Sequence, residues 1–321
     1  MATTSSVRQD WQVLTGNLKS RGKYLLESGV WSDCRFVVGP EENTFAAHML
    51  LLATTSPVFE TMFYGKMPEK GEVVITDISP GIFKMLLTYI YTDEINVKTF
   101  DQAFELYYAA KKYMMLHLQK ECMKYIESGL SPKNVCKAYE LAKLYEESDL
   151  IEKCLNMIKD DTNTILKEKS FNEVNIDTLL TIFGLNELNI ISENELFAAL
   201  SRYVIHYNNG KGKNILDGDH PYVKEAIQKI RFLTLSPRQF TEGPATSNLL
   251  NTSEKLALLM KISSPASHIG IPSQFATSTC RRTQRPCKYD ICRDPTYNSR
   301  YIVQDVKKNK ADHKIPETGT R

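Results

Sequence analysis

The chain has 321 residues, 42% of them hydrophobic and 24% charged, and this balance is typical of a soluble globular protein that buries one large or two ordinary domain cores. Its formal net charge is only +2, so electrostatics favours neither nucleic acid nor a membrane surface as a partner, and we expect neither. We recognise no secretion signal, and no apolar run approaches the ~20 residues needed to cross a bilayer.

The seven cysteines are an odd number. A secreted disulfide scaffold would instead place an even number of cysteines in a frame rich in turns. Four of the cysteines lie in stretches with hydrophobic periodicity, namely Cys34, Cys122, Cys136 and Cys154. We therefore expect a reducing compartment, the cytoplasm or the nucleus.

The first regular element is predicted over residues 17–28, where apolar residues are spaced among basic and polar ones and Gly29 supplies a helix stop. We expect the preceding residues 1–16 to be flexible. A β-rich run at residues 33–38 ends at a Gly-Pro pair and predicts a strand. A second short strand is expected at residues 44–45.

Two short helices are predicted over residues 48–55 and 58–64, because the Ser-Pro pair between them can cap the second helix and occupy its first position. A β-branched run at residues 73–78 predicts another strand. A second Ser-Pro pair precedes apolar residues at helical spacing, which predict a helix over residues 82–90.

The strongest helical pattern spans residues 99–127 and is too long for one simple helix, so we expect a break near Met115. From residue 131 onward the pattern is helical throughout, and it is clearest over residues 135–158, 170–181, 192–207 and 222–230. After about Met260 the chain is rich in Ser, Pro, Thr, Arg and Lys, which bury too little apolar surface to offset the ordering entropy. Residues 261–321 are therefore expected to form a disordered basic tail.

Two stretches resemble the signature of a BTB (POZ) domain: WSDCRFVV at residues 31–38 and FAAHMLLLATTSPVF at residues 45–59. The sequence LSPKNVC at residues 130–136 is similar to the opening of a BACK domain. Together they resemble the BTB-BACK-PHR group of BTB/POZ domain-containing proteins, in which a β-sandwich PHR domain follows the BACK helices. We expect that PHR domain to be lacking here.

The resemblance implies an α+β BTB/POZ domain, a short mixed sheet flanked by helices, over residues 17–129. An all-α BACK domain would follow over residues 130–260, before the disordered tail. The resemblance also implies a BTB homodimer that acts as an adaptor of a cullin three ubiquitin ligase and recruits a substrate protein that the sequence does not identify. The alternative is a BTB scaffold in transcription or cytoskeletal assembly without a ligase role.

A dimer interface is implied for the first predicted helix, which lies across the partner subunit in the family. The residues that would form this interface are Leu18, Tyr24, Leu25 and Leu26, with Asp33 near its centre. An amphipathic first helix could equally pack on its own domain, and that alternative stays open.

A cullin-binding motif is implied by Met67-Pro68-Glu69, since families that recruit the cullin three scaffold carry a hydrophobic residue, any residue and a glutamate at that place. There the apolar side chain fills a pocket, and the carboxylate can cap a helix terminus. An ordinary polar loop is the alternative, because three residues match easily by chance. Phe63, Tyr107 and Tyr113 could flank this surface, although tyrosines at helical spacing are often core residues.

Catalytic and metal-binding patterns are lacking in the sequence. His48 matches a structural, hydrogen-bonded histidine of the family, and no pair of histidines has ligand spacing. The trio Cys280, Cys287 and Cys292 lacks the close pairs of a zinc site. No phosphate-binding loop or nucleophile elbow is present, so we expect no enzyme activity, no metal and no cofactor.

The basic residues of the tail leave two interpretations. Arg281, Arg282 and Arg285 could serve nuclear import or phosphate contacts. A solvated, weakly interacting tail is the simpler interpretation of the same residues.

Overall fold

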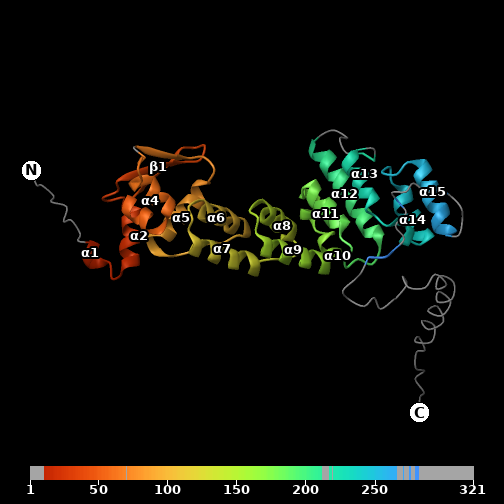
Figure 1. Cartoon of the computed structure of the whole chain (residues 1–321), viewed down its shortest axis with the longest axis horizontal. Helices are drawn as coiled ribbons and strands as arrows, with labels where there is room; N and C mark the ends of the chain where they lie inside the picture. The colour runs from red at the N-terminus through yellow and green to blue at the C-terminus, as the bar shows by residue number, and fades with distance from the viewer. Residues whose placement is uncertain are drawn as a thin grey trace, which may run out of the picture. The chain divides into compact units, whose positions relative to one another are not determined.

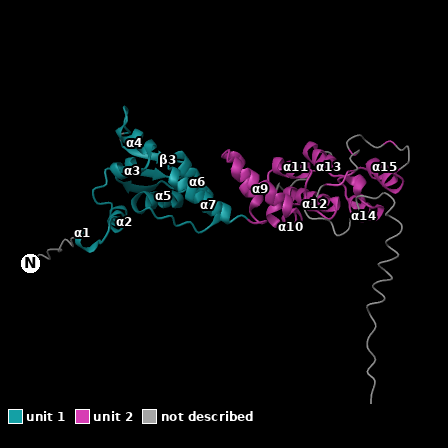
Figure 2. Cartoon of the chain, turned by 60° about the horizontal axis from the view of Figure 1, so that its bottom comes forward, with its two compact units in different colours: residues 1–130 teal, residues 131–321 magenta. Residues whose placement is uncertain are grey.

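The structure is a computed structural model of the chain, and it describes residues 11–69, 71–211, 217–218, 220–265, 270, 275 and 279–281. The chain divides into two compact units, Met1–Leu130 and Ser131–Arg321, which Figure 2 shows in different colours. Most of the predicted tail, residues 282–321, and the first ten residues lie outside the described part of the chain.

The first unit contains a three-stranded mixed sheet in the order β2-β1-β3. Strand β1 (Cys34–Val38) pairs antiparallel with β2 (Asn43–Ala47) and parallel with β3 (Glu72–Ile75). Every second residue of β1 is buried, the period that a strand with one covered face requires, and these residues are Cys34, Phe36 and Val38. The predicted α+β class with a short mixed sheet is confirmed.

The covered face of β1 packs against helices α4 (Pro57–Tyr64) and α5 (Pro80–Thr92). The ring of Phe36 makes three contacts there, with centroid separations of 5.9, 6.2 and 5.0 Å to Phe59, Phe63 and Phe83. Helix α3 (Met49–Thr55) precedes α4, and the Ser56 hydroxyl accepts the N–H of Phe59 to cap α4. The predicted Ser-Pro helix start is confirmed.

The long helical pattern forms two helices, α6 (Phe100–Lys112) and α7 (Leu116–Ser128). Between them Met114 has a φ of +53°, a left-handed conformation that ends the first helix. The predicted break near Met115 is confirmed.

The N-terminal helices are α1 (Trp11–Leu14) and α2 (Leu18–Ser28) (Figure 1). The Asn17 side chain accepts the N–H of Ser20 to start α2, and Gly29, with a φ of +65°, ends it as predicted. The expectation of a flexible N-terminus does not hold for α1, because tertiary ring contacts, described below, hold it in place.

The described residues of the second unit form helices and no strand (Figure 1). The α-helices are α8 (Val135–Leu144), α9 (Ser148–Asp160), α10 (Thr162–Ile165), α11 (Ile176–Gly184), α12 (Glu193–Lys211), α13 (Pro221–Gln228), α14 (Pro237–Glu242) and α15 (Thr252–Ser263). Three 3₁₀ turns join them, η1 (Lys169–Glu173), η2 (Phe232–Thr234) and η3 (Pro244–Thr246).

Two sequence-based expectations for the second unit need correction. The predicted helix over residues 170–181 is interrupted, because Val174 and Asn175 are extended between η1 and α11. Both residues use their backbone in tertiary hydrogen bonds: Tyr203 donates to the Val174 carbonyl, and Asn175 donates its N–H to the Glu140 carboxylate. The disordered tail was predicted to begin too early, because α15 continues to Ser263 and both Phe275 and Arg281 are buried.

Candidate functional site

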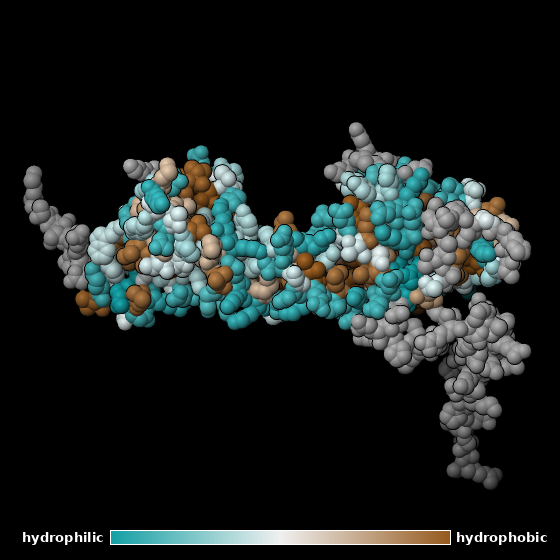
Figure 3. All heavy atoms as spheres, viewed as in Figure 1, coloured by the Kyte–Doolittle hydropathy of each residue, from teal (hydrophilic) through white to brown (hydrophobic). Residues whose placement is uncertain are grey.

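Exposed apolar side chains gather over the N-terminal helices α1 and α2 (Figure 3). Leu18, the first residue of α2, is 77% exposed, and Trp31 is 68% exposed. We define the N-terminal apolar surface by its exposed members, which are Val13, Leu14, Leu18, Tyr24 and Trp31. Exposed apolar clusters of this kind mark interaction sites more often than isolated residues do.

Three aromatic rings organise this surface. Trp11 of α1 stacks on Tyr24 of α2 with the centroids 4.5 Å apart, and it lies 5.8 Å from the ring of Trp31 at a tilt of 57°. Such contacts stabilise beyond the area that they bury. The cluster therefore fixes α1 against α2 and the turn that follows α2.

The predicted dimer residues do not all share one environment. Leu18 and Tyr24 are exposed, whereas Leu25 and Leu26 are half-buried. Helix α2 packs on α5 through the face that carries Gly22, which is buried against the backbone of Tyr91. Leu18 lies one turn before Gly22 on that same face, at the start of the helix, whereas Tyr24 lies on the other face and stacks on Trp11.

Asp33 is exposed, and its carboxylate accepts the N–H of Met49 at 2.8 Å. This bond satisfies a backbone donor at the start of α3, where a negative charge is favourable. Asp33 lies two residues after Trp31, whose side chain is exposed. The dimer interface stays a prediction, and the residues assigned to it from the sequence do not include Trp31. Its signal in the sequence was a large aromatic residue directly before the predicted strand.

The loop between α4 and β3 presents the predicted motif. Met67 is 91% exposed, and Glu69 is exposed as well. The backbone of this loop is held in place, because the Glu69 N–H donates to the Met62 carbonyl at 2.9 Å and the Gly65 N–H donates to the Thr61 carbonyl at 3.0 Å. The exposed Met67 side chain therefore contributes nothing to the stability of its own domain, although hydrogen bonds hold the backbone of its loop in place.

Three residues predicted to flank this loop lie in the core instead: Phe63, Tyr107 and Tyr113. The ring of Tyr113 stacks on Phe59 of α4 with the centroids 4.2 Å apart, and its carbonyl accepts the hydroxyl of Ser56 at 2.6 Å. Buried side chains offer no surface to a partner, so we correct their assignment from contact residues to core residues. Helical spacing in a sequence predicts which residues share a helix face, but it does not predict which other elements cover that face.

Exposed apolar residues do occur at the connection between α6 and α7, where Met114 and Leu116 lie. The bond between Ser56 and the Tyr113 carbonyl ties this connection to the start of α4. Met67 follows the other end of the same helix. Because α4 has eight residues, its two ends are separated by about 12 Å, so both sites lie within the reach of one partner.

Two protein families match the chain. The model described as BTB/POZ domain matches residues 23–130, and the model described as BTB And C-terminal Kelch (BACK) matches residues 135–243. This is a BTB–BACK protein. Domains of these families serve protein interaction, so the exposed surfaces described above are the places where its function is to be sought.

Curated relatives agree with this assignment. Human BTB/POZ domain-containing protein 3 is 32% identical over 76% of this chain and 47% of its own length, and BTB/POZ domain-containing protein 6 of Xenopus tropicalis is 31% identical over 78% and 48%. The chain thus spans about half the length of the curated relatives that it matches. Among solved structures, the BTB domain of zebrafish PATZ1 is 28% identical over 39% of this chain and all of that chain, with a TM-score of 0.32.

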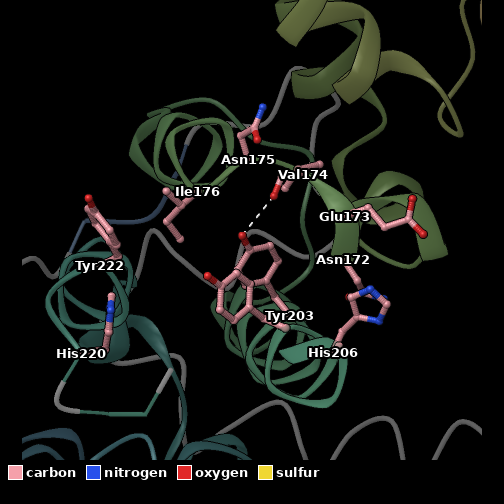
Figure 4. A pocket seen from close by; sticks show the side chains of 11 residues that line it. Asn172, Glu173, Val174, Asn175, Ile176, Tyr203, His206, His220 and Tyr222 are labelled. Carbon is pink, nitrogen blue, oxygen red and sulfur yellow. Dashed lines mark hydrogen bonds between the residues drawn. The ribbon is translucent and has the colours of Figure 1, made fainter. Parts of the chain in front are cut away.

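The BACK unit of this BTB–BACK protein contains a cavity of about 510 Å³ lined by η1 and the ends of α11, α12 and α13 (Figure 4). Tyr203 is committed to the fold, since its hydroxyl donates to the Val174 carbonyl at 3.0 Å. His206 and His220 lie on opposite sides of the cavity, and its described lining holds no serine, threonine or cysteine nucleophile.

Within the described ranges, no group of three or more His, Cys, Asp or Glu side chains is placed to hold a metal ion. Of the cysteine trio, Cys287 and Cys292 lie outside the described residues, as do Arg282 and Arg285. In the same described part of the chain, no helix combines the length and apolar character needed to cross a membrane.

Proposed function

We propose that this BTB–BACK protein acts as a homodimeric adaptor that brings the cullin three scaffold of a ubiquitin ligase to a substrate protein. The proposal rests on the 91% exposure of Met67. Backbone hydrogen bonds hold its loop in place, and the same loop presents Glu69. The motif matches the spacing used by cullin-recruiting families, and its apolar member is free to enter a partner's pocket.

The homodimer is supported by the N-terminal apolar surface. Leu18 and Trp31 expose most of their side chains, and large aromatic residues dominate the energy of protein interfaces. The stack of Trp11 on Tyr24 holds this surface in shape before a partner binds, which lowers the entropy cost of association. A second copy of the chain would present the same surface, as a two-fold interface requires.

The cullin contact is supported by two exposed apolar positions. Met67 lies in the loop after α4, and Met114 lies in the α6–α7 connection that Ser56 ties to the start of α4. Burying the Met67 side chain would contribute roughly 1.5 to 3 kcal/mol, and a charge-assisted hydrogen bond from Glu69 would contribute a similar amount. A dimer would carry two such surfaces, and avidity would strengthen its engagement of multivalent partners.

The test is calorimetric titration of purified cullin three N-terminal region into the full chain. We expect binding by the unmodified protein, and we expect the double change Met67→Ala with Glu69→Ala to weaken it by roughly two orders of magnitude or more. The matched control is Val74→Ala, which shortens an exposed apolar side chain on β3 outside the loop and should leave the affinity unchanged.

Two outcomes contradict parts of the proposal. If the unmodified protein shows no binding, the adaptor role fails and a BTB scaffold without a ligase role takes its place. If the double variant binds as well as the unmodified protein, the recruiting surface lies elsewhere, and Met114 with Leu116 becomes the first place to change.

We propose that the protein acts in the cytoplasm or nucleus. Cys34, Cys122, Cys136 and Cys154 are all buried thiols and form no disulfide. Burial raises the pKa of Cys122 to about 12, so this thiol stays protonated and inert at neutral pH. Buried thiols of this kind agree with a reducing compartment.

A further inference from the structure

Three helix ends of the BACK unit converge on one side chain, Arg281, which lies 88 residues after its ion-pair partner Glu193. Glu193 is the first residue of α12, Leu185 is the C-cap of α11, and Lys229 is the C-cap of α13. The side chains of Arg281 and Glu193 are 2% and 4% exposed. Charged side chains rarely occur at this degree of burial without partners.

Every nitrogen of the Arg281 guanidinium has an acceptor. Nε donates to one carboxylate oxygen of Glu193 at 2.7 Å, and Nη2 reaches the other at 3.4 Å. Nη2 also donates to the Lys229 carbonyl at 2.7 Å, and Nη1 donates to the Leu185 carbonyl. Such a planar set of acceptors suits a guanidinium and cannot be satisfied by the ammonium of a lysine.

The charges of the site explain why it selects a cation. The carbonyls of Leu185 and Lys229 belong to the C-terminal ends of two helices, where the helix dipole is negative. Glu193 adds a full negative charge, and its place in the first turn of α12 is itself favourable. The helix ends therefore present the two carbonyls and the carboxylate without any contribution from the arginine.

Two further contacts hold the same part of the chain. Phe275 is buried, and its ring meets that of Phe232 edge to face with the centroids 5.7 Å apart. The Thr279 carbonyl accepts Nη1 of Arg231 at 3.0 Å, and Nη2 of Arg231 binds the Asn186 side chain at 2.6 Å. We call the three anchored residues Phe275, Thr279 and Arg281 the C-terminal strap.

We propose that the helix ends around Glu193 form a binding site for an arginine-bearing linear segment, and that its occupant is the C-terminal strap of the same chain. The strap closes the three helix ends from outside and holds Arg281 against the BACK unit. This inference is independent of cullin binding, because all of its residues belong to the second unit.

The test uses Cys280, which lies inside the strap and is half-buried, as a natural reporter. The rate of its alkylation by iodoacetamide is measured in the full chain by peptide mass spectrometry, which separates it from the other cysteines. Losing a buried charge-assisted contact shifts an equilibrium by about tenfold or more. We expect Glu193→Gln and Arg281→Met each to raise the alkylation rate by about that factor, and Arg281→Lys to do so only in part.

The matched control is Arg238→Met, which removes an exposed arginine from its ion pair with Glu242 on α14 and should leave the Cys280 rate unchanged. If Arg281→Met unfolds the helical unit, seen as a loss of helical circular dichroism, the double change Glu193→Gln with Arg281→Met removes both charges. That variant should regain helicity while Cys280 remains reactive. Alkylation rates within twofold of the unmodified protein in all folded variants would overturn the proposal.

A mixing experiment separates docking within one chain from exchange between copies. Arg281→Met keeps the site and lacks the anchor, whereas Glu193→Gln keeps the anchor and lacks the charged site. Docking within one chain predicts that a mixture of the two variants keeps both Cys280 rates high. Renewed protection of Cys280 in the mixture would show that the strap docks between copies and would overturn the assignment of its occupant.

Discussion

Tyr91 and His48 are joined by two hydrogen bonds: the tyrosine hydroxyl accepts the His48 backbone N–H at 2.9 Å and lies 2.6 Å from Nδ1 of the imidazole. The other ring nitrogen, Nε2, lies 2.8 Å from the Val30 carbonyl. Because a carbonyl only accepts, Nε2 donates to Val30, and the Tyr91 hydroxyl is the partner of Nδ1. His48 thus ties α5 to the turn after α2, the structural role expected from the sequence.

Removing that hydroxyl is expected to destabilise the BTB domain. Tyr91→Phe leaves the His48 N–H and Nδ1 without a partner in a half-buried setting, which costs roughly 1 to 3 kcal/mol of unfolding free energy. Urea unfolding followed by circular dichroism measures it. Tyr125→Phe, a partly exposed position on α7, is the matched control and should change stability by less than about 0.5 kcal/mol.

The contact between α2 and α5 predicts the effect of a single methyl group. A Cβ at Gly22 would lie 2.0 Å from the Tyr91 carbonyl oxygen, so Gly22→Ala must push α2 away, at a cost of roughly 1 to 3 kcal/mol. Gly81→Ala in α5 meets nothing within 4 Å and should be neutral or stabilising by up to about 1 kcal/mol. Equal unfolding midpoints for the two variants would contradict this packing.

Dimerisation is expected to depend on the N-terminal apolar surface. Leu18→Glu places a charge at a 77% exposed position that the fold of the single subunit does not use, so the variant should be a folded monomer. Light scattering at about 10 µM measures its mass. Leu144→Glu, at a leucine of α8 that is 69% exposed, is the control and should remain a dimer. A Leu18→Glu variant that stays dimeric would place the interface on another surface.

Alkaline pH is expected to destabilise the BACK unit through Tyr203. Burial raises the pKa of Tyr203 to about 12, above its ordinary value of 10. Because the pKa of Tyr203 is higher in the folded state than in the unfolded chain, its protonated hydroxyl stabilises the fold fully at pH values below the unfolded pKa. This stabilisation is lost as the pH rises from 10 towards 12, because the unfolded chain releases its proton first. Tyr203→Phe should lower stability at about pH 8, where the Val174 carbonyl loses its donor, yet show a shallower decline at higher pH. Parallel pH profiles of urea unfolding for the two proteins would refute this role.

The short-range features of this protein can be predicted from its sequence. The Asn17 cap and Gly29 stop of α2, the Ser56 start of α4 and the break near Met115 all depend on residues within a few positions of one another. Backbone dihedral preferences and capping bonds act over that distance, so they can be read from the chain. The motif at Met67 belongs to the same class, since its exposure follows from a polar loop after a capped helix.

Tertiary packing settles which periodic aromatic residues face solvent and which distant residues meet. Tyr113 and Tyr107 are core residues because α4 and its neighbours cover them, whereas Trp31 remains exposed. The ion pair of Glu193 with Arg281 joins residues 88 positions apart, in a segment whose composition predicted disorder. Its stabilisation comes from a desolvated site built by three helix ends, and neither composition nor periodicity encodes the closing of such a site by a remote residue.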